Sequence, residues 1–302
     1  MTWLLFALCG PVLWAISTHL DKYLVERYFK DTDVAVLVLF TALMGLAAMP
    51  FIAWFDPAVL KRDVGSIGLM TLSGLLYMTA MFFYLRALQG HDATVVAPFF
   101  QTSPLFGYAL GYLVLGETLS TTQLAGGTLI VAGVLSVSLG SGKRRESFRW
   151  RLAAQMLTCG FLASLATLIF KIFAVRDEFW ATTFWMFAGE AVFGAGILAV
   201  ARYRTQLLTL LRKNRTALVV INASNELINL GGALGNRYAL VLAPLSLVQA
   251  VGSTTTLFIF GLGVVLTVFF PRFAREDLSR GELLRKVAAA ALVATGVWLV
   301  SR

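Results

Sequence analysis

The stretch that decides the fold class is LSLVQAVGSTTTLFIFGLGVVLTVFF, residues 245–270. It carries no charged side chain and exceeds the roughly 20 mostly apolar residues that a transmembrane helix needs. Backbone polar groups in hydrocarbon must be satisfied within the segment, and a continuous apolar run does so as a helix. Barrel strands would instead alternate in polarity. The stretch therefore predicts a helical membrane protein.

Similar stretches recur along all 302 residues, of which 58% are hydrophobic and 14% charged. Soluble domains average about 45–50% apolar and about 25% charged residues. Apolar windows predict an all-α integral membrane protein of ten transmembrane helices, near residues 3–20, 34–55, 64–85, 93–115, 121–140, 152–174, 179–200, 216–238, 245–270 and 283–300. Cys9 and Cys159 lie inside these windows, so we expect apolar filler rather than a disulfide or a metal site.

The two halves of the chain resemble each other. Residues 87–106 align without a gap on residues 239–258, and the most informative match is Thr102 with Thr254. The first helix of each half ends alike, with Thr18 and Lys22 against Thr167 and Lys171. We infer two five-helix units, residues 1–142 and 149–302.

Because five is odd, the second unit must cross the membrane in the opposite sense to the first. The last helix of each unit opens with a capping box, Ser120-x-x-Gln123 and Ser279-x-x-Glu282. Inverted repeats are typical of secondary transporters, which bind substrate at mid-membrane between the halves. Channels and membrane enzymes can also be duplicated.

A family resemblance rests on motifs in the first half: Ser103-Pro104-Leu105-Phe106, Leu115-Gly116-Glu117-Thr118-Leu119-Ser120, Gln123, Gly126 and Gly133. They resemble the fourth and fifth helices of the EamA family in the drug/metabolite transporter superfamily. That resemblance implies ten helices in two repeats and a transport function. The second half departs from the motif, with Phe270-Pro271-Arg272 where a Gly-Glu turn would be expected. We expect a structural role for Glu117, which lies in a turn.

Two carboxylates fall in the middle of predicted helices, Glu190 and Glu226. Such residues cost at least about 2.5–3.5 kcal/mol on insertion scales and usually face an interior or aqueous cavity. Asn222, Asn225 and Asn229 share one helix face with Glu226. The stripe is interpreted as a cavity lining, with interhelical hydrogen bonding as the alternative.

Further candidates for substrate binding are cationic, hydroxyl-bearing or aromatic. Lys22 and Lys171 either snorkel to the headgroups or share a role across the repeat, such as pairing with Glu190 or Glu226. Pro98 and Pro104 should kink the fourth helix and free its backbone carbonyls. Between them, and at the repeat-related position, polar candidates are Gln101, Thr102 and Thr254. Trp14 and Trp185 lie away from the helix ends and could offer ring faces to a substrate, although core packing is the alternative.

The sequence favours a secondary transporter of a small organic metabolite, amino-acid-like or similarly polar or amphipathic. A membrane-embedded enzyme would need a catalytic constellation such as His-Glu-x-x-His, which we do not find. A channel or scaffold subunit is the other alternative. No nucleotide-binding Gly-x-x-x-x-Gly-Lys-Ser/Thr motif occurs, so we expect no cofactor and coupling through protons or exchange. Expected partners are the substrate and the lipid bilayer of the plasma (inner) membrane, with no nucleic acid and a monomer or homodimer.

The two orientation signals disagree. Of the 25 Lys and Arg residues, 19 fall on the side of the membrane opposite the termini. The positive-inside rule then places both termini outside the cytoplasm. The family resemblance implies cytoplasmic termini.

Overall fold

A computed structural model describes residues 2–28, 32–90, 102–140, 150–176, 178–269, 280–300 and 302. Within these ranges the regular structure is entirely helical. The first half contains α1 (Thr2–Tyr28), α2 (Val34–Phe55), the short 3-10 helix η1 (Pro57–Leu60), α3 (Val64–Gly90), α5 (Ser103–Leu115) and α6 (Thr121–Gly140). The second half contains α7 (Trp150–Arg176), α8 (Phe179–Ala199), α9 (Ala201–Leu242), α10 (Leu245–Gly252), α11 (Thr255–Phe269) and α12 (Arg280–Val300).

Six described segments are long and apolar enough to cross a membrane: Thr2–Asp21, Val34–Phe55, Val64–Ala87, Trp150–Arg176, Phe179–Ala199 and Leu245–Phe269. Three further apolar helices are shorter: Ser103–Leu115, Thr121–Ser136 and Val287–Val300. The predicted eighth span, residues 216–238, is part of α9, where polar side chains lower the hydropathy. An integral membrane protein is confirmed, and the full set of ten spans stays a prediction.

Local sequence sets several helix ends. Asp33 caps α2, its Oδ1 accepting from the Ala35 N–H at 3.1 Å. Asp63 does the same for α3 through Ser66 at 2.8 Å, and these hydrogen bonds hold the pKa of the exposed Asp63 carboxyl below its usual value. The predicted capping box at Ser120 and Gln123 is confirmed by reciprocal bonds of 3.1 and 3.2 Å. Its predicted counterpart at Ser279 lies outside the described residues.

Two predicted helix boundaries were wrong. α1 continues to Tyr28, well past the predicted end at residue 20. Residues 201–215, expected to form a loop, are the first part of α9. Leu207 and Leu210 are buried there beneath an exposed Arg-bearing face, so this segment is amphipathic rather than unstructured.

The predicted ninth helix is also different, because it is interrupted at Ser253 and Thr254, which separate α10 from α11. Pro104 begins α5 instead of kinking a longer described helix, since proline is well accommodated in a first helical turn. Pro98 lies outside the described residues.

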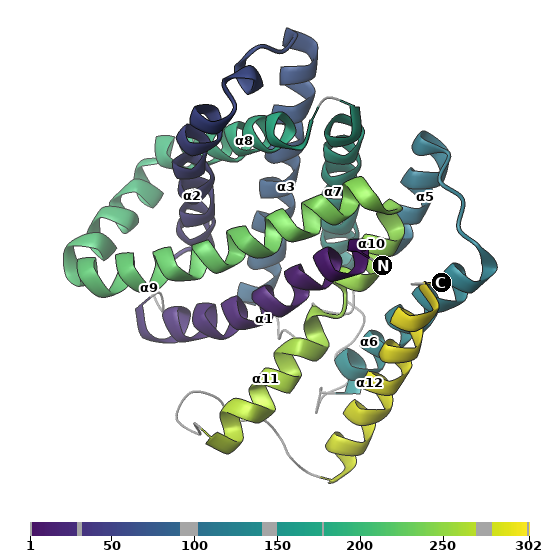
Figure 1. Cartoon of the computed structure of the whole chain (residues 1–302). Helices are drawn as coiled ribbons and strands as arrows, with labels where there is room; N and C mark the ends of the chain where they lie inside the picture. The colour runs from purple at the N-terminus through teal and green to yellow at the C-terminus, as the bar shows by residue number, and fades with distance from the viewer. Residues whose placement is uncertain are drawn as a thin grey trace.

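Packing between the halves builds the molecule. In Figure 1, α1 runs alongside α9, and α6 pairs with α12 at one edge. α3 packs on both α7 and α8, while α2 packs on α8. The largest buried apolar cluster joins α7 and α10 to neighbouring helices around Phe170, Leu245 and Leu247. The polar residues described next lie where helices of the two halves meet.

Candidate functional site

Glu190 of α8 and Arg237 of α9 form a buried ion pair. Arg237 Nη2 lies 2.8 Å from Glu190 Oε1, and the side chains are 8% and 3% exposed. The guanidinium also lies over Phe187 and Phe170, 5.0 and 5.7 Å from the ring centroids. Among the described residues, its buried Nη1 has no hydrogen-bond partner. Arg237 therefore compensates Glu190 and keeps one donor group free.

Glu226 lies on α9 in a second polar group. Its Oε1 accepts a 3.2 Å hydrogen bond from Thr41 of α2, and Asn229 also bonds to its side chain. Asn225 donates to Asp21 Oδ1 of α1 at 2.6 Å. Asn225 and Glu226 are buried. The predicted Asn stripe therefore faces neighbouring helices, which agrees with its polarity.

Asn222 completes the stripe as a buried side chain, and Asn229 is half-buried. Each contributes an amide to the same helix face. The Asn225–Asp21 contact is an interhelical hydrogen bond, which was the alternative to a cavity lining.

Two first-half helices connect the carboxylates. On α2, Thr41 contacts Glu226, and Gly45 one turn later lies against Glu190, where a Cβ atom would come within 3.1 Å of Oε2. A side chain at this position would crowd the Glu190 carboxylate, so glycine suits this close approach. Tyr77 of α3 lies within electrostatic reach of both Glu190 and Glu226. One polar region thus spans helices from both halves.

Snorkelling and pairing with Glu190 or Glu226 were the alternatives for Lys171, and the structure shows a different partner. Its ammonium group pairs with Glu117 and donates to the Ala243 carbonyl at 2.5 Å. Glu117 Oε2 in turn accepts from the Leu245 N–H at 2.8 Å, at the start of α10. The Glu117 carboxylate lies nearer to Lys171 than the carboxylates inside the bundle do, because Gly116, with φ of +65°, turns the chain back after α5. The structural role expected for Glu117 agrees with these contacts.

The interruption of the ninth helix brings hydroxyls to a helix end. Thr254 Oγ1 donates to the Val251 carbonyl at 2.7 Å, and Thr255 Oγ1 donates to Gly252 at 2.7 Å. Ser253 Oγ donates to the Gln249 carbonyl at 3.2 Å. The Gln249 and Val251 carbonyls also accept from the backbone N–H groups of Ser253 and Thr254, so the hydroxyls add second hydrogen bonds at the break. Thr254 is buried and is engaged by its own backbone.

Gln249 and Ser164 form a further polar contact that sequence reasoning missed. Their side chains lie 3.3 Å apart, and Ser164 also donates to the Ser103 carbonyl at the start of α5 at 3.1 Å. Gln249 packs over Gly107, one turn along α5. Polar side chains thus hold the start of α5 and the middle of α10 against α7.

The remaining predicted site residues lie elsewhere. Trp14 packs on Gly10 and Gly232 between α1 and α9. Trp185 donates to the Val59 carbonyl of η1 at 2.9 Å, a contact typical of core packing. Thr102 is the half-buried residue preceding α5. Gln101 and the side chain of Lys22 lie outside what the structure describes.

The two charged residues missed by the sequence analysis are Asp21 and Arg237. Asp21 was placed just beyond the first helix, although residues 21–28 carry no Pro or Gly to stop it. Arg237 falls at the end of the predicted span 216–238, although residues 239–242 are apolar and extend the helix. In both cases, the residues that follow the charged side chain are compatible with a helix, and this was the signal that the helix continues.

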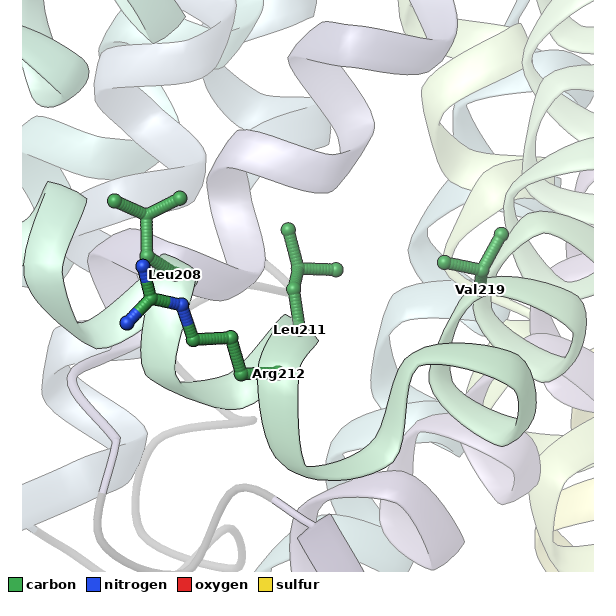
Figure 2. A pocket seen from close by; sticks show the side chains of 4 residues that line it. All are labelled: Leu208, Leu211, Arg212 and Val219. Carbon is green, nitrogen blue, oxygen red and sulfur yellow. The ribbon is translucent and has the colours of Figure 1, made fainter.

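One surface hollow lies apart from these polar groups. Figure 2 shows Leu208, Leu211, Arg212 and Val219 around a cavity of about 630 Å³ at the bend of α9. Its lining is mostly aliphatic and comes from a single helix. It therefore does not contain the carboxylates, amides or hydroxyls of the candidate site.

Comparison with known sequences finds a family match in the first half. Residues 1–139 match the EamA-like transporter family. The resemblance expected from the Gly116-Glu117 motif is therefore confirmed for this EamA-like region, and the family is one of transporters. No curated protein matches the chain.

Comparison with solved structures supports the fold of the whole chain. A structure titled only "Crystal structure of protein" is similar, with a TM-score of 0.68 and 16% sequence identity. The match covers 98% of this chain and 95% of the other. At that identity it shows the fold alone.

Proposed function

We propose that this EamA-like chain is a secondary transporter of a small polar or amphipathic organic solute, amino-acid-like in character. Two inverted five-helix repeats, residues 1–142 and 149–302, would expose the site alternately to each side of the membrane. The observation that carries the proposal is the buried polar region between the halves. Asp21, Thr41 and Tyr77 come from the first half, and Glu190, Glu226 and Arg237 come from the second.

The packing pattern supports the inverted repeat. α1 opens the first half and packs on α9, while its counterpart α7 packs on α3. By the same correspondence, α2 and α8 are counterparts that pack together, as are α6 and α12. Exchanging the two halves therefore leaves these pairings unchanged, as expected of two units related by a pseudo-two-fold axis.

A second correspondence involves helix starts. α5 begins at Ser103 and α11 at Thr255. The alignment of residues 87–106 with residues 239–258 matches these same two positions. Interrupted helices near the repeat interface are typical of transporters, because freed backbone groups can line a binding site.

Glu226 is the proposed principal transport residue, assisted by its Asn stripe and by Glu190. A carboxylate there could load and release a proton, so proton coupling and solute exchange are the two proposed energy sources. The plasma (inner) membrane is the proposed location. A membrane enzyme or a channel or scaffold subunit is the alternative class.

Counterflow in proteoliposomes tests the proposal. A thermal-stabilisation screen of polar metabolites, amino acids included, first selects a stabilising solute. Vesicles loaded with that unlabelled solute should then accumulate its labelled form transiently, with an initial rate that saturates with concentration. Flux that neither saturates nor shows counterflow would favour a channel, and protein-free vesicles provide the background.

A further inference from the structure

Oxygen-bearing side chains meet between α1, α2 and α9. Asp21 and Glu226 supply carboxylates, Asn225 contacts Asp21 at 2.6 Å, and Thr41 contacts Glu226 at 3.2 Å. The two carboxylates are close enough for their charges to interact. Ser17 lies beside Asp21, one turn earlier on α1. The group offers oxygen atoms from three helices to one small volume.

The charges of this group are not compensated by the cationic side chains that the structure describes. Arg237 pairs with Glu190, and Lys171 pairs with Glu117. His19 bonds to the Ile259 carbonyl at 3.1 Å. Two neighbouring carboxylates inside a membrane protein are costly without a positive partner. We therefore expect a positively charged group or ion beside the Asp21 and Glu226 carboxylates.

One buried oxygen of the group also lacks a partner. Among the described residues, Asn225 Oδ1 has no hydrogen-bond partner although the residue is 0% exposed. The Asn225 oxygen belongs to the same amide whose nitrogen contacts Asp21, so it lies beside that carboxylate. Buried polar atoms without partners are uncommon in proteins. Here the unmet need is for a donor or a cation.

We propose that Asp21, Asn225 and Glu226, assisted by Ser17, bind a small monovalent cation between α1 and α9. The expected ligand is a compact positive charge surrounded by oxygen atoms, either Na⁺ or the ammonium group of a solute. Carboxylate and carbonyl oxygens are typical ligands of hard cations. Among the described residues there is no group of three His, Cys, Asp or Glu side chains of the kind that holds a metal ion. The site deepens the proposed function, on which its role in transport rests.

The test is binding to the full-length purified protein in lipid nanodiscs, followed by melting at constant ionic strength. Choline chloride is replaced stepwise by NaCl, by methylammonium chloride or by MgCl₂. Because a ligand of the folded state stabilises it in proportion to ln(1 + [L]/Kd), Na⁺ or methylammonium should raise the melting temperature once its concentration exceeds Kd, and the rise should then follow the logarithm of the concentration. A response to Na⁺ assigns the site to an ion, and a response to methylammonium assigns it to the amino group of a solute.

Variants then locate the binding. Asp21→Asn and Glu226→Gln should raise the Kd fitted to this dependence at least tenfold, and the milder Ser17→Ala severalfold. Glu178→Gln removes an exposed carboxylate paired with Arg62 at the surface and should leave it unchanged. Parent protein that responds to neither monovalent cation would overturn the proposal, as would a response preserved in Asp21→Asn and Glu226→Gln or one confined to Mg²⁺.

Direct binding of labelled Na⁺ or methylammonium to the parent protein gives a result even if a variant fails to fold. Saturable binding supports the proposal, and its absence for both probes refutes it. Neither measurement requires transport. Binding without counterflow would overturn the transport function alone, whereas counterflow without cation binding would overturn this inference alone.

Discussion

Lys171 of the second half is paired with Glu117 of the first, and both bond to the chain that joins α9 to α10. The Lys171 ammonium donates to the Ala243 carbonyl, and the Glu117 carboxylate accepts from the Leu245 amide. This ion pair thus connects the turn after α5, helix α7 and the start of α10. It connects the halves without using the carboxylates of the candidate site.

Breaking that pair should destabilise the protein. Lys171→Met leaves Glu117 partly buried without its cation, and losses of about 3–5 kcal/mol accompany the removal of one partner of a buried pair. Glu117→Gln should cost less, because the amide oxygen can still accept from Leu245. Melting in detergent should show that the double variant loses less stability than the sum of the single variants. Additive losses would mean that the two charges act independently.

The Glu190–Arg237 pair provides a second prediction. Arg237→Met should be destabilising because it leaves Glu190 buried and uncompensated, again by about 3–5 kcal/mol. Combining it with Glu190→Gln should recover much of the melting temperature. If the double variant is stable yet transports no solute, the pair is needed for transport itself. Stability that fails to recover would instead identify Arg237 as a packing residue over Phe187.

Glu226→Gln should abolish pH-driven transport while leaving the fold nearly intact. The amide has the shape of the carboxyl group and can still accept from Thr41, but it cannot exchange a proton. Solute accumulation driven by an imposed pH gradient is the measurement, with monodispersity in size-exclusion chromatography as the control. If this variant transports solute like the parent protein at every pH tested, Glu226 has no coupling role. The Asn stripe would then serve only in interhelical hydrogen bonding.

The repeat-related threonines are expected to border the substrate path. Trp at Thr102 or Thr254 should block transport by filling space between the halves, whereas Trp at Leu292, which is 41% exposed on α12, should be tolerated. Leu129→Trp on α6 is the matching first-half control. Because Thr254 also caps its own helix break, Thr254→Val separates loss of the hydroxyl from loss of space. Normal flux through both Trp variants would place the path elsewhere.

The orientation in the membrane can be tested with a C-terminal fluorescent fusion. Lys171 and Arg237 were counted with the loops on the terminus side, yet both are buried in ion pairs and carry little topological information. Removing them makes the charge asymmetry larger, so we predict that both termini lie outside the cytoplasm. A fusion that fluoresces only in the cytoplasm would show that the family resemblance predicts the orientation better than the charge count.

The sequence predicted helical class and approximate spans well because both follow from hydropathy alone. It also located Glu190, Glu226 and the Asn stripe, since isolated polar residues are conspicuous in apolar surroundings. Partner choice could not be predicted in this way. Whether Lys171 reaches Glu117 or Glu226 depends on how helices pack, and hydropathy carries no information about rotation or neighbours.

The missed residues have a related cause. Asp21 and Arg237 stand at the edges of apolar windows, where a window average cannot distinguish a helix end from a polar residue inside a longer helix. The interruption at Ser253 and Thr254 was hidden for the opposite reason. These hydroxyl residues barely lower the hydropathy of a span that otherwise remains apolar.

That interruption has a consequence for biogenesis. The insertion machinery meets Leu245–Phe269 as one apolar segment, long enough to leave the translocon in a single step. Afterwards the chain can bend without presenting bare carbonyls to lipid, because Gln249 and Val251 keep backbone partners and the Thr255 hydroxyl donates to the Gly252 carbonyl from within the segment. The bent shape is thus compatible with insertion before the neighbouring helices have been synthesised. The segment can enter the bilayer without first packing against those helices.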